Sequence, residues 1–141
     1  MYNNSTEEEN VIEFLTNPGP VAVIGASNKP HRAGHYVPKF LQSKGFQIIP
    51  INPYEVKILG EKTLENQEQL ETEIKGMIIY REIHAAKNEA LKAIEANRTP
   101  LIWFPDNVVS DKVGTVAKEH NVTFIQDRCP LRDYRYYIEN D

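Results

Sequence analysis

Short apolar runs alternate with amphipathic segments along most of this chain. The runs have the apolar, β-branched character of buried strands, and they cover residues 21–24, 46–51, 76–80, 100–104 and 122–125. Apolar positions at three- and four-residue spacing predict helices, and they mark residues 37–41, 86–94, 109–117 and 131–138. Strands that alternate with helices in this way predict an α/β fold, a doubly wound five-stranded parallel sheet with helices on both faces.

The N-terminal region carries its own helix signal. Ser5-Thr6-Glu7-Glu8 predicts a capping box, and an apolar face follows it, so we expect a helix over residues 6–16 that packs on the sheet. Asn17-Pro18-Gly19-Pro20 then predicts a turn before the first strand. Neither a repeat nor a long linker divides the chain, and residues 1–141 are therefore expected to form a single domain.

The stretch between the second and third strands has a weaker pattern. Residues 54–60 are predicted to be a loop. Residues 61–74 are acidic and poorly patterned, and we expect in them a short helix around residues 66–70. The rest of this acidic stretch is expected to be a solvated surface.

Composition and charge exclude several classes of function. The chain of 141 residues has a net charge of −4 and a pI near 5.6, so nucleic acid is not an expected partner. No apolar run approaches the roughly 18 residues of a membrane helix, so a membrane partner is not expected either. Residues 1–10 are polar and acidic, unlike a targeting peptide, and Cys129 is the single cysteine. These features predict a cytoplasmic protein.

The stretch from Val21 to Gly34 has the chemistry of a phosphate site. A buried strand ends at Gly25, and a polar loop with Lys29, His31 and Arg32 leads into a helix. Glycine permits close backbone approach, the helix N-terminus offers N–H groups, and the cations add charge. The local cations on an acidic background favour a small anionic ligand. An ordinary strand–helix turn with solvated cations is the alternative.

Two common nucleotide-binding motifs are absent from this stretch. Gly25 is followed by Ala26 rather than by the remainder of a G-x-G-x-x-G sequence, and the second strand ends in Asn52-Pro53 without a carboxylate for a ribose. No Gly-Lys-Ser or Gly-Lys-Thr follows either. These residues therefore argue against the ordinary nicotinamide or flavin dinucleotide site and against a Walker-type nucleotide site.

Six motifs, in order along the chain, carry a resemblance to a known family. They are Val23 to Arg32 (Val-Ile-Gly-Ala-Ser-Asn-Lys-Pro-His-Arg), Ile51-Asn52-Pro53, Leu59-Gly60-Glu61, Tyr80-Arg81, Trp103, and Asp127-Arg128-Cys129-Pro130. The chain from about Val21 onward resembles the small bacterial and archaeal CoA-binding domain proteins. This resemblance implies a Rossmann-like domain related to the CoA-binding part of succinyl-CoA synthetase.

The resemblance also implies a ligand, coenzyme A or an acyl-CoA, and the residues that would hold it. Those expected at the phosphates are Gly25, Ala26, Ser27, Lys29, Pro30 and Arg32. Asn52 and Pro53 are expected near the adenosine, and Tyr80 and Arg81 along the ligand. Trp103 is a further candidate at a strand end, with core packing as its alternative. Lys and Arg suit the 3′-phosphate and pyrophosphate of CoA on chemical grounds as well.

The chain departs from the family pattern after its fourth strand. Family members often have Met-Gln and a glycine there, whereas this chain has Phe104-Pro105-Asp106, which removes a donor and adds a negative charge. We expect this change to affect the pantetheine end of the ligand more than its phosphates. Cys129 is expected to be a small buried side chain at the start of the last helix, with a nucleophile or acyl acceptor as the alternative.

The expected function is binding of CoA or an acyl-CoA without catalysis, because no activated nucleophile or acid–base pair falls at the strand ends. Four scattered histidines give no metal-ligand spacing. Two alternatives stay open: a subunit or fragment of an acyl-CoA ligase or transferase, and an interaction protein with a degenerate nucleotide site. The tyrosines near the C-terminus are compatible with a homodimer, and the ligase alternative needs a partner subunit.

Overall fold

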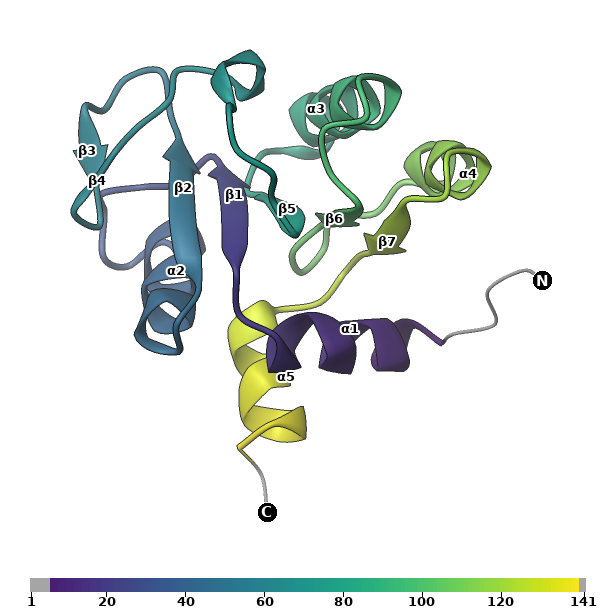
Figure 1. Ribbon diagram of the computed structural model, residues 1–141, viewed down its shortest axis with the longest axis horizontal. Helices are drawn as coiled ribbons and strands as arrows, with labels where there is room; N and C mark the ends of the chain where they lie inside the picture. The colour runs from purple at the N-terminus through teal and green to yellow at the C-terminus, as the bar shows by residue number, and fades with distance from the viewer. Residues whose placement is uncertain (1–5, 140–141) are drawn as a thin grey trace.

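A five-stranded parallel sheet forms the centre of the protein (Figure 1). The computed structural model describes residues 6–139. In spatial order the strands are β2 (Gln47–Ile51), β1 (Pro20–Ile24), β5 (Gly76–Ile79), β6 (Leu101–Trp103) and β7 (Thr123–Ile125). The sheet confirms the predicted α/β fold, and no strand end differs from the prediction by more than one residue.

Helices cover both faces of the sheet, as Figure 1 shows. On one face lie α1 (Glu7–Thr16), α2 (Ala33–Ser43) and α5 (Pro130–Tyr137). On the other face lie α3 (Ile83–Glu95) and α4 (Asp111–Glu119). This is the doubly wound, Rossmann-like arrangement. Among residues 6–139, every helix is too short or too polar to cross a membrane.

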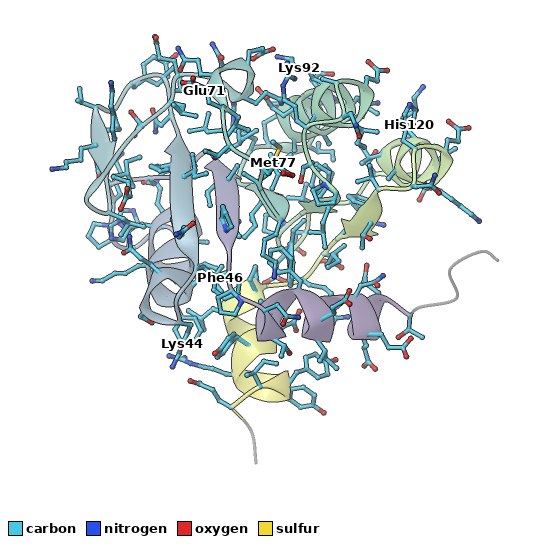
Figure 2. All side chains as sticks on the ribbon, in the orientation of Figure 1. Lys44, Phe46, Glu71, Met77, Lys92 and His120 are labelled. Atoms are coloured by element: carbon cyan, nitrogen blue, oxygen red, sulfur yellow. The ribbon has the colours of Figure 1, made fainter. Side chains whose placement is uncertain are left out.

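The core has two layers because side chains alternate along each strand. Val21 and Val23 of β1 face α1, α2 and α5, whereas Ala22 and Ile24 face α3 and α4. In Figure 2, Met77 lies on the α3 side of the sheet, and Phe46 lies on the opposite side near α1 and α5. In β1, the residues from Val21 to Ile24 are all buried, which explains why the strand is a continuous apolar run.

The capping box of α1 lies one residue later than predicted. The Thr6 hydroxyl accepts a hydrogen bond from Glu9 N (3.1 Å), and the Glu9 carboxylate accepts one from Thr6 N (2.8 Å). Ser5, the residue expected to begin the box, lies outside the described residues. The helix itself packs on the sheet through Val11, Phe14 and Leu15, as expected.

A small antiparallel hairpin replaces part of the loop predicted over residues 54–60. Its strands are β3 (Lys57–Ile58) and β4 (Glu61–Lys62). Leu59 and Gly60 both have positive φ, 54° and 80°, as a tight two-residue hairpin turn requires. Ile58 is fully buried and attaches the hairpin to the core. The predicted short helix near residue 66 is a 3₁₀ turn, η1 (Gln67–Gln69).

Candidate functional site

A cavity of about 830 Å³ opens beyond the carboxyl ends of β1 and β5. The strand order reverses at this point, since the chain continues from β1 to β2 on one side and later returns to β5 on the other. Ligands of open α/β sheets bind at such a reversal. The structure brings six of the predicted site residues to the cavity wall: Gly25, Ser27, Lys29, Arg32, Tyr80 and Arg81.

Two glycines hold the loop after β1 against the end of β5. Gly25 has a φ of +82°, and a Cβ added there would lie 2.1 Å from the carbonyl oxygen of Tyr80. A Cβ on Gly34 would lie 2.7 Å from the carbonyl oxygen of Gly25. Both positions therefore require glycine for close backbone approach. The result is a tight backbone turn that lines the cavity at Gly25, Ser27 and Gly34.

Hydrogen bonds fix the loop between β1 and α2. Ser27 N donates to Gly34 O (3.1 Å), and Lys29 N donates to the Ser27 hydroxyl (3.0 Å). His35 Nδ1 lies 2.7 Å from Ser27 O, a hydrogen bond when this nitrogen carries the proton. Asn28 Nδ2 donates to Lys57 O (2.9 Å) and so ties the loop to the hairpin. The loop is thus held in one shape before any ligand arrives.

The cavity wall carries uncompensated positive charge. Arg32 is the N-cap residue of α2 and makes no side-chain cap hydrogen bond, so the N–H groups of Ala33 and Gly34 remain available to a ligand. Within residues 6–139, Lys29, Arg32 and Arg81 take part in no ion pair. Helix N–H groups and cations together form an anion-binding site.

The two acidic side chains in the cavity wall are already engaged. Glu82 caps α3 by accepting hydrogen bonds from His84 N (2.9 Å) and Ala85 N (2.7 Å), which lower the pKa of this carboxyl. Asp106 accepts two hydrogen bonds from Arg132, at 2.8 and 2.9 Å, and this pairing lowers the Asp106 pKa. The negative charge that the sequence placed at this corner is therefore compensated by a neighbouring guanidinium.

The predicted adenosine-side residues lie at a second hollow of about 300 Å³, which shares Gly25 and Arg81 with the main cavity. Asn52 and Pro53 both line it. Asn52 Nδ2 donates to the carbonyl oxygen of Ala26 (2.9 Å), so this side chain joins the end of β2 to the loop after β1. The two hollows meet at Gly25 and Arg81, the residues that follow β1 and β5.

Three predicted site residues line neither of the two hollows. Trp103 is fully buried, its indole N–H donates to Arg128 O (2.8 Å), and its ring lies 5.7 Å from that of Phe14. Ala26 is also fully buried and offers its backbone to Asn52. Pro30 is exposed in the loop but lies outside the cavity lining. Trp103 thus packs in the core, which is the alternative to contact with a ligand.

Tyr80 has a buried hydroxyl with no hydrogen-bond partner, alone in this respect among the buried side-chain N and O atoms of residues 6–139. Burial raises the pKa of Tyr80 well above its usual range, and the Cys129, Tyr36 and Asp106 side chains nearby add to this shift. These three neighbours also line the cavity, so the hydroxyl lies in its wall. An unpartnered buried hydroxyl costs stability in the ligand-free protein.

Tyr80→Phe should therefore stabilise the ligand-free protein. Removing an unpartnered hydroxyl is expected to raise the free energy of unfolding by about 1 kcal/mol, because the desolvation cost disappears. The measurement is urea denaturation followed by circular dichroism. Tyr36→Phe is the matched control, since Tyr36 is 45 % exposed and should change stability by less than about 0.5 kcal/mol. A destabilised Tyr80→Phe protein would contradict the assignment of an orphaned hydroxyl.

Sequence patterns missed several residues of the cavity wall. Tyr36 and Glu82 line it because the first turns of α2 and α3 both begin beside it. Pro105 and Cys129 line it from the ends of β6 and β7. A helical period extended back four residues from Phe40 could have indicated Tyr36, but the contribution of Cys129 depends on where α5 is docked. No group of three or more metal-binding side chains occurs within residues 6–139.

Comparisons with known proteins agree with this geometry. A family model described as a CoA binding domain matches residues 20–135. The uncharacterized protein YneT of Bacillus subtilis is 30% identical over 129 residues, which cover 92% of this chain and 93% of YneT. A hypothetical protein from Pyrococcus horikoshii has a solved structure with the same fold (TM-score 0.86, 23% identity), covering 98% of this chain and 99% of that one.

A much larger protein shares part of the sequence. Subunit alpha of the ADP-forming acetate–CoA ligase II of Pyrococcus furiosus is 33% identical over 70 residues. The match covers 49% of this chain and 15% of the ligase subunit. The similarity therefore concerns a small part of that subunit.

Proposed function

The chain belongs to the CoA-binding domain family, and from this premise we propose that it binds coenzyme A or an acyl-CoA without catalysing a reaction itself. The observation that carries the proposal is the loop after β1. There, Gly25 and Gly34 bring backbone close to the cavity floor, and α2 begins without a side-chain cap. Three cations without ion pairs among the described residues surround this backbone, as an extended phosphate ligand requires.

The proposed binding mode follows the two connected hollows. The pyrophosphate is assigned to the loop residues that line the cavity, Gly25, Ser27, Lys29 and Arg32, whereas Ala26 and Pro30 shape the loop without contact. The adenosine is assigned to the hollow lined by Asn52 and Pro53, and Arg81, which lines both hollows, to the phosphates between them. Tyr80 is assigned to the pantetheine arm. Trp103 supports the site from the core rather than by contact.

Two features support a binding role rather than catalysis. Within the described chain, neither the Ser27 hydroxyl nor the Cys129 thiol is hydrogen-bonded to a histidine side chain, since His35 contacts only the Ser27 carbonyl oxygen, so no activated nucleophile is assembled. The carboxylates of Glu82 and Asp106 are occupied by a helix cap and an ion pair. A general acid or base needs a group free to exchange protons with the substrate.

Titration calorimetry with CoA tests the proposal directly. CoA should bind more tightly than dephospho-CoA, ADP or NAD, because the cations at the cavity can contact both the pyrophosphate and the 3′-phosphate. Equal affinities for all four ligands would reduce the site to a general nucleotide pocket. Absence of binding to all four would overturn the proposal.

Arg32→Ala should weaken CoA binding about tenfold or more, since a charge-assisted hydrogen bond contributes roughly 1.5–3 kcal/mol. Lys39→Ala is the matched control: Lys39 is exposed on the same helix, does not line the cavity, and its loss changes the net charge equally. Calorimetry of both variants with CoA measures the difference. Similar losses of affinity in the two would mean that only the overall charge matters, which would contradict the phosphate assignment.

The similarity to the acetate–CoA ligase subunit favours a second candidate function. In this alternative, the chain supplies the CoA site and a partner subunit supplies the chemistry. Affinity purification from the source cells, followed by an assay for acyl-CoA formation, distinguishes the two. Recovery of a stoichiometric partner with that activity would favour the second candidate, and recovery of a CoA-binding protein without one would favour the first.

A further inference from the structure

Cys129 is the one polar residue of the Asp127-Arg128-Cys129-Pro130 motif whose side chain makes no hydrogen bond within residues 6–139, although it packs in part against the core. Asp127 has a φ of +58°, and its carboxylate accepts a hydrogen bond from Asn107 N (2.7 Å). Arg128 pairs with Asp133, with Nε 2.9 Å from the carboxylate, and Pro130 opens α5 at its first turn. Cys129 is the N-cap of α5 but makes no side-chain cap hydrogen bond. Its neighbours thus fix the backbone that presents the thiol.

The thiol is presented to the cavity. Cys129 is half-buried rather than enclosed in the core, and it lines the cavity together with Tyr80 and Pro105. The same cavity is lined at the α2 side by Lys29 and Arg32, the residues assigned to phosphate. One continuous space therefore joins the anion site to a free cysteine.

The orphaned hydroxyl of Tyr80 is an independent sign that a ligand reaches this end of the cavity. Buried polar groups are normally hydrogen-bonded, and this one lacks a partner among the described residues. Tyr80 and Cys129 both line this cavity, so the two residues share one wall. A ligand arm with amide groups would supply the missing partner. The pantetheine arm of CoA has two amides and ends in a thiol.

We propose that Cys129 is a site of reversible covalent modification, at which it forms a mixed disulfide with CoA. This inference rests on the proposed CoA-binding function. The co-reactant is the disulfide form of CoA. The Cys129 thiolate attacks one of its sulfurs, the S–S bond between the two CoA molecules breaks, and one CoA leaves as a thiolate that takes up a proton. One disulfide is consumed and one is formed, so the exchange needs no further oxidant.

The covalent step would retain CoA beyond its reversible affinity, and a reductant would release it. The geometry assigns specificity to the anion site: phosphate contacts at α2 hold the incoming disulfide while the thiol end reaches Cys129. A small disulfide without phosphates lacks this anchoring. Glutathione disulfide should therefore react more slowly than CoA disulfide at the same concentration.

Intact-protein mass spectrometry tests the inference on the full chain. Reduced protein incubated with CoA disulfide should gain the mass of one CoA, and dithiothreitol should remove it. Because Cys129 is the single cysteine, any disulfide adduct is at this residue. The rate should exceed that with glutathione disulfide at least tenfold, and Arg32→Ala or unfolding in urea should remove most of this preference. Equal rates with the two disulfides in the folded protein would overturn the inference.

Calorimetry of the unmodified protein with reduced CoA separates this inference from the proposed function. Reduced CoA should bind reversibly, and Cys129→Ser should form no adduct with CoA disulfide. If CoA binds reversibly but CoA disulfide shows no preference over glutathione disulfide, the covalent site is wrong and the proposed function stands. If neither form of CoA binds, both fail.

Discussion

Replacing Gly25 with alanine should destabilise the protein by about 4 kcal/mol or more, a large part of the 5–15 kcal/mol that stabilises a typical domain. The added Cβ would lie 2.1 Å from the carbonyl oxygen of Tyr80, at the end of the neighbouring strand. That oxygen belongs to backbone and cannot rotate away as a flexible side chain could. Relief requires β1 and β5 to separate at the point where the cavity forms. Urea denaturation followed by circular dichroism measures the loss.

Gly60→Ala is the matched control for this prediction. Gly60 has almost the same backbone conformation, with a φ of +80° against +82° for Gly25, but a Cβ added there meets nothing within 4 Å. The left-handed conformation alone costs a non-glycine residue roughly 1–2 kcal/mol. The excess loss in Gly25→Ala therefore measures close packing at the cavity floor. Equal losses in the two variants would show that the strand ends tolerate the extra carbon.

The sheet could be predicted from the sequence because its central strands are buried on both faces. Such strands are continuous apolar runs, and Val21 to Ile24 is the clearest example. The hairpin of β3 and β4 could not be predicted in the same way. Each strand has two residues, too few for a period of two to emerge. Of these four residues, Ile58 alone is buried.

The candidate site could be predicted where its residues are contiguous. Gly25, Lys29 and Arg32 fall within one strand–loop–helix unit, and all three line the cavity. Charge compensation across the fold could not be predicted, because Arg132 pairs with Asp106 from 26 residues away. The burial of Trp103 is similarly decided by packing against Phe14 of α1, a contact made through tertiary structure.

Arg128→Ala should cost roughly 3 kcal/mol of stability, because the change leaves a buried carboxylate without its cation. Asp133 is 6 % exposed, and Arg128 contacts it with two nitrogens, at 2.9 and 3.4 Å. Arg128 also donates to the Tyr137 hydroxyl (3.1 Å) and lies 3.4 Å from a Glu7 carboxylate oxygen, so it joins α5 to α1. The loss should appear in urea denaturation.

Arg132→Ala controls for the removal of an arginine–carboxylate pair as such. Its two hydrogen bonds to Asp106 are of similar length, but both side chains are exposed, 59% and 43%, and such pairs contribute only about 0–1 kcal/mol. The double variant Arg128→Ala/Asp133→Ala should be more stable than Arg128→Ala alone, because no unpaired charge stays buried. The double variant could instead lose as much free energy of unfolding as the two single variants lose together. That result would show that the loss comes from packing between α1 and α5. In that case, the motif would hold Cys129 at the cavity through contact area rather than through charge.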